Sequence, residues 1–128
     1  MKRLLVLTAS LEALLGLALM IDPSLVARLL LGDGVTGAGA VVGRVAGLAL
    51  LSLGLACWPG RDPASRPIPA ARAMLTYNLL VTCYLTFLGI GSDFVGLLLW
   101  PAAVIHGLLT LLLVREWKKV PRSSDTKG

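Results

Sequence analysis

Four apolar stretches, each close to the thickness of a lipid bilayer in length, take up most of this 128-residue chain. A helix needs roughly 20 residues to cross a hydrocarbon layer about 30 Å thick, because it rises ~1.5 Å per residue. The composition agrees, since 56% of the residues are hydrophobic and 15% are charged, with a mean hydropathy of +0.83. We therefore predict an all-α integral membrane protein, a four-helix bundle with spans at about residues 4–21, 35–58, 70–91 and 94–117.

The residues outside these spans are too few for a separate soluble domain, so residues 1–117 are expected to form one membrane domain. The Pro-rich stretch 59–69 is predicted to be an extended loop, and residues 118–128 a disordered cytoplasmic tail. The start of the chain resembles a secretory signal peptide. However, Glu12 interrupts the apolar run and no small-x-small pattern follows Ile21, so we expect the first span to be retained.

Lysine and arginine gather on one side of the predicted spans, which is expected to face the cytoplasm. The opposite side holds Asp22, Asp33 and Asp93 with a single basic residue, Arg28. This predicts a multi-pass protein of a bacterial inner membrane with both termini in the cytoplasm. We attribute the net charge of +5 to topology and to lipid headgroups, and predict no nucleic-acid partner. The basic residues on the cytoplasmic side are Lys2, Arg3, Arg61, Arg66, Arg72, Arg115, Lys118, Lys119, Arg122 and Lys127.

A short helix is predicted on the outer surface between the first two spans. Asp22 is a typical capping residue, and Pro23 suits the first position of a helix. The following residues 24–31 are mostly apolar, and Gly32-Asp33-Gly34 is typical of a helix end. We expect this helix to lie along the membrane surface.

Small residues recur every four positions on the second span, at Gly39, Gly43 and Gly47. Such a strip lets the backbone of another helix approach closely. A comparable strip on the first span predicts that these two spans pack tightly together. A homodimer or another membrane partner is the alternative use of the strip. The residues of the first span are Ala9, Ala13 and Gly16.

Each span also carries one strongly polar residue near its middle: Glu12, Arg44, Asn78 and His106. A charged side chain in hydrocarbon costs roughly 2.5 to 3.5 kcal/mol on insertion scales, so such residues usually face the bundle interior and pair. Their depths from the cytoplasmic side are about 12 Å for Glu12 and Asn78, 16 Å for His106 and 21 Å for Arg44. Because the arginine side chain is long, we predict a Glu12–Arg44 ion pair.

Two interpretations of this cluster remain open. The four side chains either fix helix register through interhelical bonds of roughly 0.6 to 2 kcal/mol each, or line a ligand pocket or proton-accessible cavity. Imidazole titrates near neutral pH, which suits proton transfer or ligand recognition. Pro101 is expected to kink the last span and open space beside His106. Tyr77 and Tyr84 are interpreted as packing residues.

The sequence contains no pattern typical of a catalytic, metal or cofactor site. Cys57 and Cys83 fall in different spans without a Cys-x-x-Cys pattern, and there is a single histidine. We therefore predict no metal and no cofactor. The lipid bilayer and a lipophilic small molecule are the predicted partners.

Several features together resemble small four-helix bacterial membrane proteins, the DoxX-like group among them. They are the acidic first helix with its Asp-Pro turn, the Arg-x-x-Gly at Arg44, the basic Pro-rich loop, and Trp100-Pro101 with His106. The resemblance implies a compact bundle and assigns no activity. The function predicted is binding of a lipophilic ligand or partner helix at the polar cluster. The alternatives are an accessory subunit, an enzyme acting on a lipid or isoprenoid, and a proton-coupled carrier.

Overall fold

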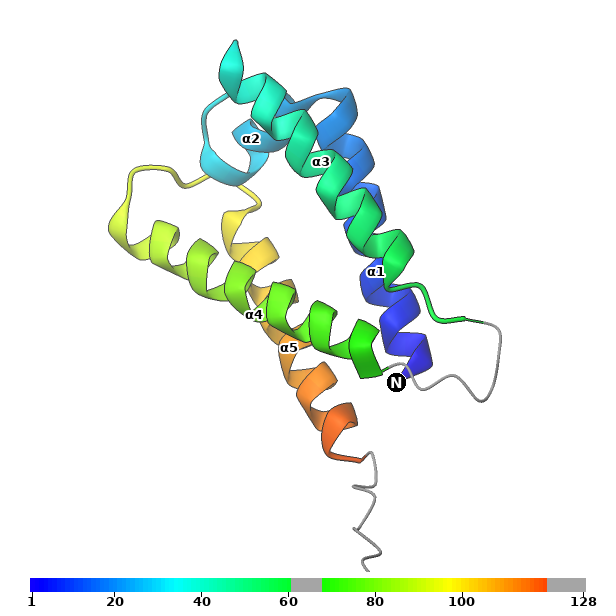
Figure 1. The fold of residues 1–128 in the computed structure, drawn as a ribbon. Coiled ribbons are helices and arrows are strands. Elements are labelled where there is room, and N and C mark those ends of the chain that lie inside the picture. The colour runs from blue at the N-terminus through cyan, green and yellow to red at the C-terminus, as the bar shows by residue number, and fades with distance from the viewer. Residues whose placement is uncertain (61–67, 120–128) are drawn as a thin grey trace, which may run out of the picture.

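The computed structural model describes residues 1–60 and 68–119, and within them the protein is all-α. Most of the predicted Pro-rich loop and the predicted tail from residue 120 lie outside the described residues. Four helices are long and apolar enough to cross a membrane, and a fifth is short (Figure 1). The predicted fold class is therefore confirmed. The helices are α1 (Lys2–Ile21), α2 (Pro23–Leu31), α3 (Ala38–Ala56), α4 (Ile68–Gly91) and α5 (Leu99–Lys118).

The short helix α2 begins and ends at the residues that its sequence indicated. The Asp22 carboxylate accepts a hydrogen bond of 2.9 Å from the Leu25 amide, and Pro23 occupies the first helical position. Gly32 ends the helix with a φ of 82°, a left-handed conformation that costs glycine little. α2 thus folds back from the end of α1 and contacts both α3 and α5.

The last spanning helix starts later than expected, at Leu99 and not at residue 94. Residues 92–98 bond to α2 and do not continue a helix: the Gly96 amide donates to the Leu30 carbonyl at 3.0 Å, and the Leu98 amide to the Leu29 carbonyl at 2.7 Å. Pro101 consequently lies in the first turn of α5, where amides have no intrahelical acceptor. The physical basis for the expected kink is therefore absent.

α1 and α3 form an antiparallel pair in close backbone contact (Figure 1). A Cβ atom added to Gly16 would lie 2.7 Å from the Gly47 carbonyl oxygen, and one added to Gly54 would lie 2.7 Å from that of Ala9. The two contacts define a single antiparallel register, in which Gly16 lies opposite Gly47 and Ala9 lies opposite Gly54. Glycine is required at these positions because any side chain would push the helices apart.

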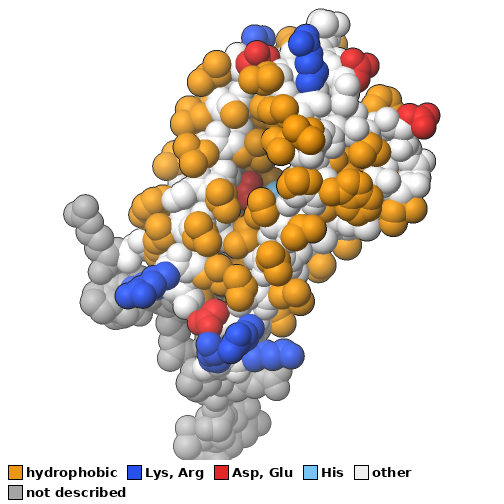
Figure 2. All heavy atoms as spheres, turned by 180° about the vertical axis from the view of Figure 1, so that it is seen from behind, with side chains coloured by type: hydrophobic (Ala, Val, Ile, Leu, Met, Phe, Trp, Pro, Cys, Tyr) orange, Lys and Arg blue, Asp and Glu red, His pale blue; other side chains and the backbone are white. Residues whose placement is uncertain are grey.

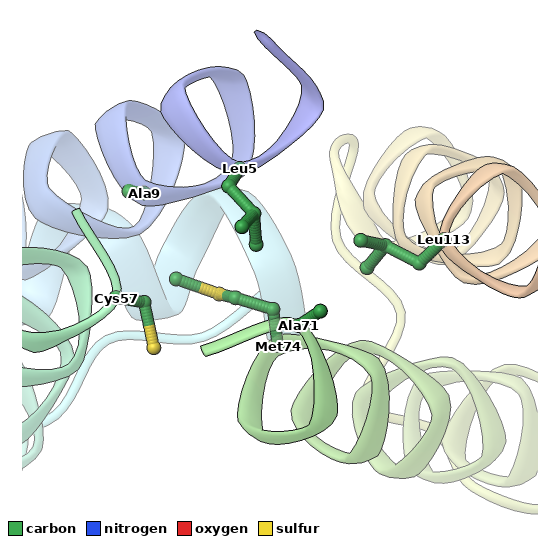
Figure 3. Packing of buried hydrophobic residues seen from close by; sticks show 6 residues of the cluster. All are labelled: Leu5, Ala9, Cys57, Ala71, Met74 and Leu113. Atoms are coloured by element: carbon green, nitrogen blue, oxygen red, sulfur yellow. The ribbon is translucent and has the colours of Figure 1, made fainter. Parts of the chain in front are cut away.

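α4 and α5 form the second pair, and the two pairs meet near the end that holds the N-terminus. There, apolar side chains from all of the spanning helices or their ends form the buried cluster shown in Figure 3. The Met1 ammonium also lies 3.0 Å from the Glu116 carboxylate. Toward the other end the pairs diverge, and α2 with residues 92–98 bridges them (Figure 1). The buried cluster consists of Leu5, Ala9, Cys57, Ala71, Met74 and Leu113.

Candidate functional site

A cavity of about 490 Å³ lies between the two helix pairs, beneath the bridge that α2 forms. Its walls are apolar, and the polar side chains that reach it belong to Tyr77 and His106. Figure 2 shows the corresponding hollow among hydrophobic side chains, with a histidine and an acidic side chain at its floor. Its volume falls within the roughly 300 to 1,000 Å³ of ligand pockets. The apolar residues that line it include Leu15, Leu19, Leu29, Leu30, Val81, Leu85 and Ile105.

His106 of α5 is held by Asn78 of α4. The imidazole Nδ1 lies 2.8 Å from the Asn78 Oδ1, and the Asn78 Nδ2 donates to the Met74 carbonyl at 2.8 Å. Because a carbonyl only accepts, the second bond fixes which amide atom faces the imidazole. Nδ1 must therefore donate its proton to Oδ1, which makes Nε2 the acceptor in the neutral ring. Asn78 itself is fully buried.

Glu12 of α1 lies beside this pair and is only 1% exposed. Its Oε1 is 3.9 Å from the His106 Nδ1, too far for a hydrogen bond. Within the described residues, neither carboxyl oxygen accepts a hydrogen bond. A buried carboxyl group without a donor is unusual, since nearly all buried polar groups in proteins are bonded. Both Glu12 carboxyl oxygens can therefore still accept hydrogen bonds.

The Tyr77 ring connects these residues to the cavity wall. It meets the His106 ring edge to face, with centroids 6.0 Å apart and an interplanar angle of 77°. Its phenol interacts electrostatically with the Glu12 carboxyl, although the two form no hydrogen bond of good geometry. One turn along α1 from Glu12, Leu15 also lines the cavity. Tyr77 and His106 therefore form the floor of the cavity, with Glu12 directly behind them, and we call these three side chains the polar floor.

Arg44 is the one predicted cluster residue that the structure does not bring to the others. It is exposed, and Glu12 forms no ion pair with it. The register of α1 and α3 explains the error. Gly47 lies opposite Gly16, so Arg44 is level with residue 19, seven positions or about 10 Å beyond Glu12. The predicted Glu12–Arg44 ion pair is wrong, and His106 occupies the place beside Glu12.

The predicted glycine strip is used unevenly. Gly47 packs against α1, and a Cβ atom on Gly43 would lie 2.7 Å from the Pro23 side chain of α2. Gly39 approaches only the Val35 side chain that precedes it. Gly54 extends the close contact toward the other end of α3, and the sequence pattern does not mark it because its seven-residue spacing from Gly47 breaks the four-residue repeat. For Tyr77 the sequence likewise predicts only a packing role, whereas the structure places it at the cavity wall. Its position next to Asn78 was the available signal.

The floor offers hydrogen-bonding groups and no assembled metal site: among the described residues, no group of three His, Cys, Asp or Glu side chains could hold a metal ion. Comparison with known proteins adds no relative. No protein-family model, curated protein or solved structure matches the chain. The function must therefore be inferred from the geometry of the cavity.

Proposed function

We propose that this protein binds a lipophilic small molecule in the cavity between its two helix pairs. The observation that supports the proposal is an apolar chamber of about 490 Å³ that ends at Tyr77 and His106, with Glu12 behind them. Apolar walls with a few convergent polar groups are the usual construction of a small-molecule site. An intramembrane ionisable residue such as Glu12 is by default a candidate for function.

The alternative of an accessory subunit depended on a glycine strip free to receive a partner helix. Gly47 packs against α1 and Gly43 against α2, so this part of the strip is already covered within the chain. Binding in the cavity therefore has the stronger support. The resemblance to the DoxX-like group stays a prediction.

The proposed setting is a bacterial inner membrane, with both termini on the cytoplasmic side. Three of the five described acidic residues, Asp22, Asp33 and Asp93, belong to the connections at one end of the spans. Lys2, Arg3, Arg115, Lys118 and Lys119 belong to the helix ends at the other. Cytoplasmic retention of basic residues supports this orientation. The cavity then opens between helices in the membrane, where a lipophilic ligand is concentrated.

Decanol is a suitable probe, added to the protein purified in detergent while thermal unfolding is followed. A ligand that binds only the folded state raises the unfolding temperature in a concentration-dependent way. Ala102→Phe fills the cavity from α5, and it should weaken decanol binding by roughly tenfold or more, which is ~1.4 kcal/mol per tenfold. Ala46→Phe, on an exposed face of α3, is the matched control and should bind like the parent. Equal binding by both variants would exclude the cavity as the site.

A further inference from the structure

The polar floor contains more hydrogen-bond acceptors than donors. Both Glu12 oxygens lack a donor within the described residues. Nε2 of His106 is the imidazole nitrogen left for a ligand, because Nδ1 donates to Asn78. The Asn78 amide protons cannot serve a ligand easily, since Nδ2 is engaged by the Met74 carbonyl in a fully buried position. Among these side chains the Tyr77 hydroxyl is the remaining donor, and its phenol interacts with the Glu12 carboxyl.

The floor also lacks a basic side chain to balance its acidic one. In the described part of the chain, Glu12 forms no ion pair with a lysine or arginine, and its ionisable neighbour within 4.0 Å is the imidazole, at 3.9 Å. Arg44 lies about 10 Å away along the helix axis and faces outward. The other described basic residues belong to the helix ends or to α2. A ligand that brings positive charge would therefore meet no basic competitor.

We propose that the ligand is a lipophilic ammonium, with a protonated amine at one end and an apolar body. This inference rests on the proposed binding function. A primary ammonium carries three N–H donors and no acceptor, which complements the two Glu12 oxygens and the His106 Nε2. Its apolar body fits the leucine-lined walls above. Charge-assisted bonds of this kind are roughly twice as strong as neutral ones.

Other head groups match the floor less well. An alcohol brings one donor and leaves at least one Glu12 oxygen unbonded, at the cost that buried unpaired acceptors carry. A carboxylate brings further acceptors to a site that already has an excess, which discriminates against it. The Tyr77 ring also favours a cation, because an ammonium near the face of an aromatic ring is attracted to it. The expected order of affinity is therefore ammonium, then alcohol, then carboxylate.

A matched decyl series tests the order on the full-length protein in detergent at neutral pH, with decylammonium, decanol and decanoate as probes. We expect decylammonium to bind roughly tenfold or more tightly than decanol, the effect of adding a partner to a buried charged group. Glu12→Gln keeps the shape and removes the charge, and should abolish this preference, so that decylammonium binds no more tightly than decanol. Asp93→Asn removes the same charge from an exposed position and should keep the preference.

The outcomes separate the two proposals. Equal affinity for decylammonium and decanol, or a preference that survives Glu12→Gln, would overturn the ammonium inference and leave the cavity as a lipophilic site. Failure of every probe to bind would overturn both. If Glu12→Gln does not fold, the order measured on the parent chain still decides. If phosphatidylethanolamine in nanodiscs competes with decylammonium and phosphatidylcholine does not, the ammonium comes from a lipid head group. If decylammonium binds equally in both lipids, the ligand is a free amine.

Discussion

At the scale of single residues, the orientation of His106 depends on the two hydrogen bonds that the Asn78 side-chain amide forms. Its nitrogen bonds to its own helix and its oxygen to His106 of α5, so it orients the imidazole and joins α4 to α5. The sequence could place Glu12, Asn78 and His106 at similar depths. It could not show that the side chain beside Glu12 is His106 and not Arg44, because the direction in which each side chain points depends on how the helices pair.

A double-mutant cycle measures the bond between Asn78 and His106. Asn78→Ala, His106→Ala and the double variant should show a coupling of roughly 0.6 to 1.7 kcal/mol, the range of interhelical hydrogen bonds in membranes. The measurement is unfolding by sodium dodecyl sulfate in mixed micelles, followed by circular dichroism. Coupling of this size is expected because the bond is fully buried and joins two helices.

The control cycle pairs Asn78→Ala with Thr110→Val. The Thr110 hydroxyl donates to the His106 backbone carbonyl at 2.8 Å and forms no hydrogen bond with Asn78. These two changes should therefore add within about 0.5 kcal/mol. Additivity in the cycle of Asn78 with His106 as well would refute the interhelical bond.

At the scale of helices, glycine spacing indicates which faces pack but not how long the contact is. The four-residue spacing correctly marked Gly43 and Gly47 as positions of close approach. It also marked Gly39, which has no helix against it because α3 has only just begun at Ala38. The pattern does not mark Gly54, because leucines occupy positions 51 and 55, where the four-residue repeat would continue. The length of a helix contact depends on where both helices begin, and a periodic pattern does not carry that information.

Gly47→Ala and Gly39→Ala should therefore differ in sign. A Cβ atom at position 47 would lie 2.6 Å from the Gly16 carbonyl oxygen, so α1 and α3 must separate, at a cost of roughly 1 to 3 kcal/mol. At position 39 the new methyl group meets only a side chain at 3.3 Å. There alanine should be neutral or stabilise the helix by up to about 1 kcal/mol. Unfolding in mixed micelles measures both, and equal losses would mean that Gly39 also packs against a helix.

At the scale of the whole molecule, the cavity exists because two helix pairs meet at one end and are held apart at the other. Hydropathy predicts the number of spans, and the Asp-Pro and Gly signals predict α2. The divergence of the pairs depends on contacts between residues far apart in sequence, such as Gly96 with Leu30. No periodicity within a single helix encodes such a contact. The cavity was therefore predicted only as a possible use of polar residues, while its walls and its roof follow from the fold.

The bridge between α2 and residues 92–98 should therefore control both stability and binding. A Cβ atom on Gly96 would overlap the Leu29 carbonyl and lie 2.7 Å from the Gly32 amide nitrogen, so Gly96→Ala must displace this segment from α2. We expect a loss of roughly 1 to 3 kcal/mol in unfolding free energy. Decanol binding should weaken severalfold as well, because Val26, Leu29 and Leu30 of α2 line the cavity.

Gly91→Ala is the matched control for this change. It lies at the end of α4, close in sequence to Gly96, and a Cβ atom there would meet nothing within 4 Å. It should keep both the unfolding free energy and the decanol affinity. If Gly96→Ala lost stability but bound decanol like the parent, α2 would hold the helix pairs together without shaping the site, and the cavity would have to be completed by α1, α4 and α5 alone.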